Sequence, residues 1–270
     1  MNIEGIPGFW KIVSSKPHRL LALDYDGTLA PFRIERMDAE PLPGILESLS
    51  TLSDRRSCRN TTLAVISGRP ANEVSQLLDN LAIPLYGTHG YEYLDEQNAL
   101  RLFSPDEANC DGLNTALRAA QSAGLFEMTE KKISSVAIHT RGRDNAQNIL
   151  DRIIKLWEPI AQTTNLKIRH FDGGVEMRAT DRDKATAIQE LLETCPRGTL
   201  PVYIGDDDTD EDAFQFLRKT GGYGIRVGDK RQQTAALGSL PNCESVLRFL
   251  HTWRRIICPS QAKTIRTIQH

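Results

Sequence analysis

The hydrophobic positions of this chain fall into short continuous runs and longer stretches with helical spacing. Apolar runs of strand length that stop at a polar residue or a glycine predict buried parallel strands. These runs are Arg19–Leu23, the TTLAVI stretch before Ser67, Ile83–Tyr86, Leu200–Ile204 and Tyr223–Val227. Apolar residues repeating about every 3.6 positions predict amphipathic helices. They lie in the segments 42–52, 185–192, 209–217 and 246–257, and Pro70 sits where a further helix would begin. This alternation predicts a parallel sheet with right-handed crossovers.

The pattern changes between about Ser104 and Arg178. A helical face around Leu113–Ala120 precedes the strand-like KISSVAIHTR, and a longer helical face runs from Ile149 to Ile160. LKIRHF and GGVEMRA then predict a hairpin closed around Asp172, Gly173 and Gly174. Two successive helix–strand–strand units indicate a separate small sheet. The predicted fold class is therefore α/β, with a Rossmann-like core of residues 1–100 and 181–270 and a smaller α/β domain inserted at 101–180.

Composition narrows the function classes. The chain has 270 residues, 25% of them charged, with a net charge of -2 and no dominant basic block, which argues against a nucleic-acid or anionic-membrane surface. No apolar run approaches the ~18 residues of a membrane helix, and the N-terminus has no signal-peptide pattern. Five scattered cysteines without a CxxC pair favour a reducing compartment. We therefore expect a cytoplasmic protein with no nucleic-acid or membrane partner.

Polar side chains follow several of the predicted core strands. Asp24 and Asp26 follow the first strand in DYDGT, Ser67 follows the second in SGRP, and Lys184 precedes the helix that leads to Leu200–Ile204. Taken singly, DYDGT is typical of a turn, SGRP of a helix cap, and Lys184 of a solvated surface. Open parallel sheets build their sites at the carboxyl ends of their strands, so the combined pattern favours one shared site.

The stretch IGDDDTDEDAF, residues 204–214, carries six carboxylates in eleven residues. One interpretation is a helix start with Thr209 as N-cap and acids suited to the helix dipole. The other is a bound divalent cation, because carboxylates this close otherwise repel. We divide the stretch between the two interpretations. The assignments are Asp206 to the metal, Asp207 and Asp210 to the metal's second shell of waters, Glu211 and Asp212 to the helix start, and Asp208 to no role.

These residue types fit phosphoryl transfer through an aspartyl-phosphate. Asp24 is the candidate nucleophile, and Asp26 is placed to protonate the leaving oxygen and later to deprotonate water. Asp24 and a phosphate repel each other, so Mg²⁺ is expected between them, held by Asp24, the carbonyl oxygen of Asp26 and Asp206. Ser67 can donate to a phosphate oxygen, and Lys184 can neutralise developing charge.

LDYDGTLAPF, VISGRP, the downstream lysine and GDDDTDEDAF closely resemble the four motifs of the haloacid dehalogenase (HAD) superfamily. GTHG, the pair Glu130 and Lys132, HTR at 139–141 and VEMR at 175–178 are similar to features of the trehalose-6-phosphate phosphatases. The resemblance covers about Leu20 to Gly228. It implies Mg²⁺-dependent hydrolysis of trehalose 6-phosphate, with the inserted domain as a mobile lid that reads the sugar. A trehalose-6-phosphate synthase of the same pathway is an implied partner.

The resemblance also implies substrate contacts. Those in the core are Thr28, Gly68, Arg69 and His89, and those in the lid are Glu130, Lys132, Arg141 and Glu176. The chain departs from the family pattern at Thr140, Ala185 and Asp208, and Thr140 leaves room for a different sugar.

Other functions remain open at this stage. The same fold would serve a phosphatase of sucrose phosphate, mannosyl-phosphoglycerate or glucosylglycerol phosphate, and fold analogy alone does not choose among them. An ATP-driven or mutase relative is a further alternative. A non-catalytic regulatory domain would be expected to lose a catalytic group, whereas all of them are present here.

Overall fold

The computed structural model describes residues 3–33, 35–54, 56, 58, 60–171, 173–228 and 233–258. The chain divides into two compact units. Met1–Arg101 together with Asp183–His270 forms one, called the core unit below, and Leu102–Arg182 forms the other, called the inserted unit.

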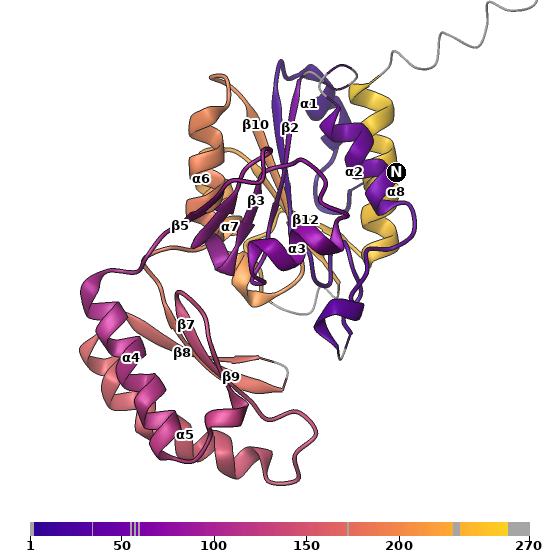
Figure 1. Cartoon of the computed structure of the whole chain (residues 1–270). Coiled ribbons are helices and arrows are strands. Elements are labelled where there is room, and N and C mark those ends of the chain that lie inside the picture. Colours follow the sequence, from indigo (N-terminus) through magenta and orange to yellow (C-terminus); the bar gives the residue numbers. More distant parts are fainter. Residues whose placement is uncertain are drawn as a thin grey trace, which may run out of the picture. The chain divides into compact units, whose positions relative to one another are not determined.

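An eight-stranded sheet occupies the centre of the core unit, in the order β12-β11-β10-β1-β2-β3-β4-β5 (Figure 1). Neighbouring strands from β12 to β3 are parallel, and β4 runs antiparallel to β3. The strands are β1 (Arg19–Leu23), β2 (Thr61–Ile66), β3 (Leu85–Gly87), β4 (Glu92–Leu94), β5 (Leu100–Leu102), β10 (Leu200–Gly205), β11 (Tyr223–Val227) and β12 (Gly238–Leu240). The predicted α/β fold with a parallel sheet is confirmed.

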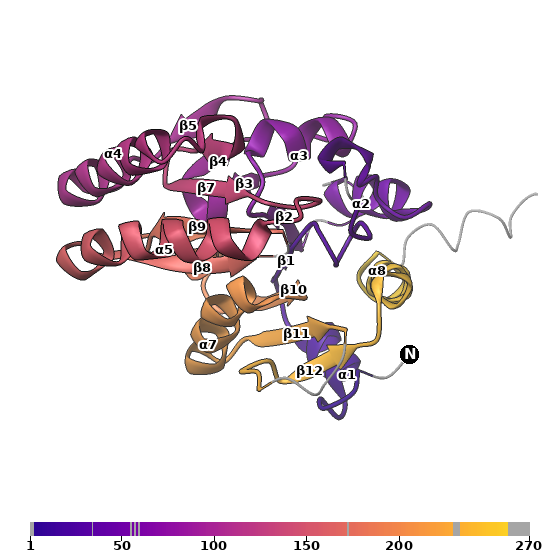
Figure 2. The ribbon, with the colours of Figure 1, turned by 90° about the horizontal axis from the view of Figure 1, so that it is seen from below.

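Helices cover both faces of this sheet because its strands are apolar on both sides. Leu21 and Leu23 of β1 pack toward one helical layer, and Leu20 and Ala22 pack toward the other. The first layer contains α1 (Phe9–Ser15), α2 (Ile45–Ser53), α3 (Ala71–Leu77) and α8 (Cys243–Ile257), and the second contains α6 (Lys184–Thr194) and α7 (Glu211–Thr220). Figure 2 shows α7 and α8 on opposite sides of the sheet.

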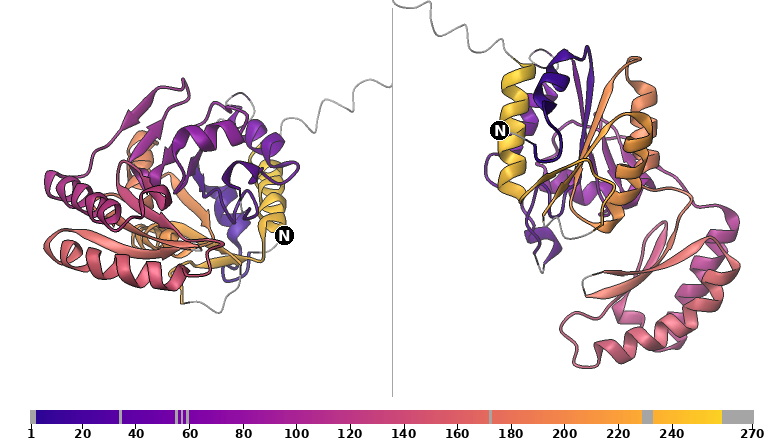
Figure 3. Two further views of the ribbon diagram at one scale, coloured as in Figure 1. Left: turned by 60° about the horizontal axis from the view of Figure 1, so that its bottom comes forward. Right: turned by 180° about the vertical axis from the view of Figure 1, so that it is seen from behind.

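The inserted unit has its own antiparallel sheet, in the order β6-β7-β9-β8. Its elements are α4 (Glu107–Ser122), β6 (Thr129–Lys131), β7 (Ser135–His139), α5 (Ala146–Thr163), β8 (Leu166–Phe171) and β9 (Gly174–Ala179). The two helices lie side by side along the sheet (Figure 3), and the buried indole of Trp157 on α5 donates to the carbonyl oxygen of Ala116 on α4 at 3.0 Å. The predicted pairing of β8 with β9 is confirmed, whereas Asp172 at its expected turn lies outside the described residues.

Several elements had no expectation from the sequence. They are α1, the short strands β4, β5 and β12, and the 3₁₀ turns at Arg36–Asp38, Thr88–Gly90, Phe126–Met128 and Asp208–Asp210. These three strands have three residues each, too few to show a period of two. Thr209 as a helix N-cap is wrong, because Asp207 caps the 3₁₀ turn by accepting from the backbone N–H of Thr209 at 2.8 Å.

Cysteine pairing also differs from the expectation. Cys58 and Cys258 form a disulfide, with Cα atoms 5.2 Å apart across a sequence separation of 200, whereas Cys110, Cys195 and Cys243 are free. The bond joins the segment before β2 to the end of α8, a proximity that cysteine spacing cannot show. Among the helices within the described ranges, none is both long and apolar enough to cross a bilayer.

Candidate active site

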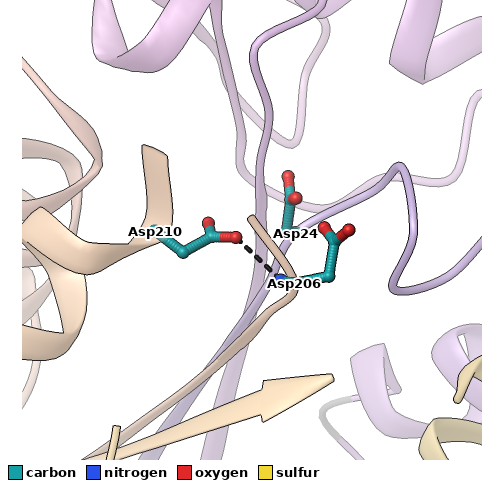
Figure 4. Close-up of side chains that lie close together, drawn as sticks. All are labelled: Asp24, Asp206 and Asp210. Atoms are coloured by element: carbon teal, nitrogen blue, oxygen red, sulfur yellow. Dashed lines mark hydrogen bonds between the residues drawn. The ribbon is translucent and has the colours of Figure 1, made fainter. Parts of the chain in front are cut away.

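Carboxylates from two neighbouring strand ends meet at one edge of the core sheet. β1 and β10 are parallel with Leu23 opposite Ile204, so the residues that follow them emerge together. Asp24, Asp206 and Asp210 each offer an oxygen within 4.8 Å of the others (Figure 4). Asp24 and Asp210 are buried, and Asp206 is partly buried. Three carboxylates this close favour a bound cation.

Asp210 uses both carboxylate oxygens to hold its neighbours. Oδ1 accepts from Lys184 Nζ at 2.6 Å and from the Tyr203 hydroxyl at 2.6 Å. Oδ2 accepts from the backbone N–H groups of Asp206 and Asp207 at 2.8 and 2.9 Å. Asp210 is fully buried, and these four donors leave it little capacity for a direct metal bond. Its geometry is that of a residue that orients the loop carrying Asp206. No sequence pattern identified Tyr203, which points into the site from a strand that looks uniformly apolar.

Lys184 connects the two acidic strand ends. Its Nζ lies 3.0 Å from Asp24 Oδ1 and 2.6 Å from Asp210 Oδ1, and the side chain is 2% exposed. The lysine is the first residue of α6, whose start is fixed by the Asp183 side chain accepting from Thr186 N–H at 2.8 Å. Burial by itself lowers the pKa of Lys184, but Asp210 and Asp24 outweigh it and raise that pKa. Lys184 therefore stays a cation at any physiological pH.

The remaining carboxylates are in excess over this single ammonium group. Burial raises the pKa of Asp24 well above its ordinary value, against the opposing effect of Lys184. Burial, followed by the charges of Asp207 and Asp210, raises the pKa of Asp206 to about 8. Burial also disfavours the charge of Asp207, but Lys184 and the hydrogen bonds from Thr209 lower its pKa. An oxygen-only donor set with this surplus of negative charge fits a hard divalent cation such as Mg²⁺.

Asp26 is held by a different partner from Asp24. Arg69 Nε and Nη2 bond its two carboxylate oxygens at 2.6 and 2.7 Å. Arg69 also donates to the carbonyl oxygen of Arg36 and lies over the ring of Tyr25. Gly27 has φ of +67°, and a Cβ there would lie 2.1 Å from Asp206 Oδ2. The DYDG turn thus requires glycine where it approaches the acidic loop.

The other core candidates surround the loop after β2. Ser67 is 1% exposed, and its Oγ accepts from the backbone N–H of Arg69 at 3.1 Å. A Cβ on Gly68 would lie 2.7 Å from Cε1 of His89, so the imidazole packs directly on this glycine. Thr28 is fully buried, and its Oγ1 has no hydrogen-bond partner within the described part of the chain. Ser67, Gly68 and His89 thus form one connected group beside the acidic strand ends.

In the inserted unit, three of the predicted lid residues share one face of the sheet. Glu130 and Glu176 both pair with Ala137 across adjacent strands, and their side chains therefore point to the same side. Lys132 Nζ lies 3.9 Å from Glu130 Oε2. The neighbouring Lys131 instead bonds Asn114 on α4 at 2.9 Å, which identifies the other side as the helix-covered one.

Arg141 lies in the loop after β7, beyond the paired strand positions. It lines a cavity of about 520 Å³ together with Thr140, His170 and Phe171. Two residues that belong to the HTR and VEMR motifs, but were not among the expected substrate contacts, border the charged face. His139 Nε2 lies 2.9 Å from Glu130 Oε2, and the buried Arg178 has its Nη1 3.8 Å from Glu176 Oε1.

The Glu211 side chain bonds residues outside α7. The carboxylate accepts from Arg226 Nη1 at 2.9 Å, Thr234 Oγ1 at 2.6 Å and the backbone N–H of Ala235 at 2.8 Å. It therefore also anchors the segment that follows β11, a role that the sequence pattern did not predict. Glu211 and Asp212 both lie in the first turn of α7, as expected. The Asp208 side chain is 82% exposed and lies 3.8 Å from Arg226 Nη2, away from the buried acids.

The sequence and the fold of this chain are both similar to those of known proteins. The family model described as trehalose-phosphatase matches residues 22–241. A probable trehalose-phosphate phosphatase of Sinorhizobium fredii is 31% identical over 228 residues, covering 84% of this chain and 84% of that protein. The trehalose-6-phosphate phosphatase of Escherichia coli K12 is 26% identical over 235 residues, covering 85% of each. The C-terminal domain of C. albicans trehalose-6-phosphate phosphatase superposes with a TM-score of 0.75 at 21% identity, covering 94% of this chain and 98% of that domain.

Proposed function

Because this chain belongs to the trehalose-phosphatase family of the HAD superfamily, we propose that it hydrolyses trehalose 6-phosphate to trehalose and phosphate. Because trehalose-phosphate phosphatases are phosphoric monoester hydrolases, membership of this family makes the chain an enzyme of that class. The observation that carries the proposal is the buried pairing of Asp24 with Lys184, which lie 3.0 Å apart beside Asp206 and Asp210. A carboxylate fixed in this way at a strand end is suited to nucleophilic attack on phosphorus.

Asp24 would attack the phosphorus atom and displace the sugar oxygen, leaving the phosphoryl group on its carboxylate. Lys184 would hold Asp24 in position and offset the negative charge that develops on the phosphoryl oxygens. Ser67 would donate its hydroxyl proton in a hydrogen bond to one of those oxygens. Asp26 would protonate the departing sugar oxygen and then take a proton from the water that releases phosphate from Asp24. Its carboxylate would first have to release one oxygen from Arg69.

We assign the Mg²⁺ site to Asp24, Asp206 and the carbonyl oxygen of Asp26. Asp210 supports this assignment, since it fixes the backbone of Asp206 and Asp207 and leaves the Asp206 carboxylate unengaged by the hydrogen bonds described above. Bound Mg²⁺ would supply positive charge between the nucleophile and the phosphate, which otherwise repel each other. The protein residues alone cannot neutralise that charge, because Lys184 already faces two carboxylates.

The inserted unit is proposed to be the lid that selects the sugar. Its support is the shared sheet face of Glu130, Lys132 and Glu176, which presents charges of both signs from one rigid sheet. Charged groups form strong hydrogen bonds to hydroxyls, and a site built on such bonds rejects analogues that lack them. Closure over the correct sugar would exclude water from the transfer.

The test is a phosphate-release screen with Mg²⁺ over trehalose 6-phosphate, sucrose phosphate, mannosyl-phosphoglycerate, glucosylglycerol phosphate and p-nitrophenyl phosphate. We expect the highest kcat/KM with trehalose 6-phosphate. A higher value with another sugar phosphate would replace the substrate, and no release from any of them would favour a non-catalytic domain.

Variants of the inserted unit refine this test. Glu176→Ala or Lys132→Ala should lower kcat/KM for the disaccharide phosphate by ~10²-fold or more, about 2.7 kcal/mol, while aryl phosphate hydrolysis hardly changes. Lys131→Ala is the matched control, because its side chain faces α4. Equal losses with both substrates would contradict sugar reading by these residues.

The proposal extends to the surroundings of the enzyme. A trehalose-6-phosphate synthase would supply the substrate. A cytoplasmic location is also proposed. Because a reducing compartment disfavours the disulfide between Cys58 and Cys258, the test is the redox state of these two cysteines in protein isolated under thiol-blocking conditions.

A further inference from the structure

Glu92, the first residue of β4, joins two loops of the candidate site and belongs to none of the motifs. Its Oε2 accepts from the backbone N–H of Ala71 at 2.7 Å, and its Oε1 accepts from Thr88 Oγ1 at 2.7 Å. Ala71 begins α3 directly after the Ser67 loop, and Thr88, the second residue of GTHG, begins the 3₁₀ turn after β3. One carboxylate therefore connects the loop after β2 with the turn after β3.

The turn after β3 requires restraint because its backbone is strained. Thr88 and His89 have φ of 48° and 56°, in the left-handed region that non-glycine residues rarely adopt. Thr88 is β-branched, which makes that conformation a clear outlier. Residues in such a conformation persist only where their surroundings fix them.

Two backbone hydrogen bonds join the strained turn to the Ser67 loop. Thr88 N–H donates to the Arg69 carbonyl oxygen at 2.8 Å, and His89 N–H donates to the Ser67 carbonyl oxygen at 2.9 Å. The imidazole of His89 packs on Gly68 so closely that no Cβ would fit there. A shift of the turn must therefore move the Ser67–Arg69 backbone or open a gap beside it.

From these contacts we infer that Glu92 is a positioning residue for phosphate binding. By accepting from Ala71 and Thr88 at once, it fixes the Ser67 loop against the His89 turn. The inference rests on the proposed function only in taking the Ser67 loop as the phosphate-binding loop. It does not depend on which sugar the enzyme prefers.

Glu92→Ala removes both acceptors. We expect the Ki of inorganic phosphate, measured with Mg²⁺, to rise about tenfold, and the KM for p-nitrophenyl phosphate and for the sugar phosphate to rise by the same factor. The kcat should change less, because Asp24 and Lys184 are held by other contacts. Glu92→Gln should stay within about threefold of wild type, since its amide oxygen can accept from Ala71 N–H while its NH₂ donates to the Thr88 hydroxyl.

Glu73→Ala is the control, because it removes a carboxylate from α3, the helix that begins at Ala71, and the partner of that carboxylate is Arg36. It should leave the Ki and KM unchanged. A folded Glu92→Ala enzyme with the wild-type Ki would overturn the inference, as would a Glu92→Gln enzyme as impaired as Glu92→Ala. If Glu92→Ala does not fold, Thr88→Val decides: a Ki raised about threefold supports the inference, and an unchanged Ki refutes it.

The same assays separate this inference from the proposed substrate. A wild-type enzyme that cleaves p-nitrophenyl phosphate but not trehalose 6-phosphate would refute the substrate. The Glu92 comparison would then still be decided by the aryl substrate and inorganic phosphate.

Discussion

Replacing Asp210 by asparagine should both destabilise the protein and weaken its divalent-cation binding. Asparagine has nearly the same shape but offers one acceptor oxygen where aspartate offers two. The native oxygens accept from four donors: Lys184, Tyr203 and the backbone N–H groups of Asp206 and Asp207. If the remaining oxygen keeps the backbone donors, the new NH₂ group must face the ammonium and the hydroxyl.

The magnitude follows from two opposing effects. Breaking a buried ion pair by removing one partner costs about 3–5 kcal/mol, because the other charge is left buried. Here the loss is smaller, because Lys184 retains Asp24 at 3.0 Å and the removal of one negative charge eases repulsion of Asp24 and Asp206. We expect a decrease of about 2–4 kcal/mol in the free energy of unfolding.

Urea denaturation with and without Mg²⁺ measures this change, and titration calorimetry measures cation binding. Asp208→Asn is the matched control: its side chain is 82% exposed, so it should shift stability by less than about 0.5 kcal/mol and leave Mg²⁺ affinity unchanged. A change below about 1 kcal/mol for Asp210→Asn, together with native Mg²⁺ affinity, would refute the central role of Asp210.

Three further outcomes are expected. Asp24→Asn should fold but release phosphate at a rate near background, because an amide is a very poor nucleophile and the uncatalysed hydrolysis is extremely slow. Turnover by a pure, folded variant would contradict the role of Asp24 as the nucleophile. Without divalent cations, the free energy of unfolding should fall as pH rises from about 4 to about 8. The contribution of Asp206 alone is up to about 1.4 kcal/mol per pH unit, since its raised pKa leaves the folded state holding a proton that the unfolded state has lost. Thermal denaturation across pH measures this slope, which Asp206→Asn should flatten and which saturating Mg²⁺ should remove. Reduction of the Cys58–Cys258 disulfide should lower the free energy of unfolding by about 2–4 kcal/mol, and Cys58→Ser should make the protein insensitive to reductant.

The hydrophobic pattern by itself determined the main elements of this protein. β1, β10 and β11 begin at the predicted residues, and each of the longer helices overlaps a predicted amphipathic stretch. Burial on both faces of a parallel strand produces continuous apolar runs, and burial on one helix face produces a 3.6-residue period, so both signals are local. The ends of the strands were also marked by a local signal, the change from apolar to polar residues, which is why Asp24, Ser67 and Asp206 were identifiable as candidates. Three-residue strands such as β4 and β12 carry no such signal, because their pairing depends on neighbouring strands.

Only the tertiary structure decided which side chains act on one another. Lys184 and Asp210 are 26 residues apart in sequence, Glu92 and Ala71 are 21 apart, and Arg69 and Asp26 are 43 apart. A carboxylate's role depends on its burial and on the donors that surround it, and those donors come from other strands and loops. The sequence of six acids therefore did not reveal that Asp210 is the buried acceptor of four donors or that Glu211 anchors a distant segment. The disulfide across 200 residues follows the same rule, since proximity in the folded chain, not spacing along it, sets the pair.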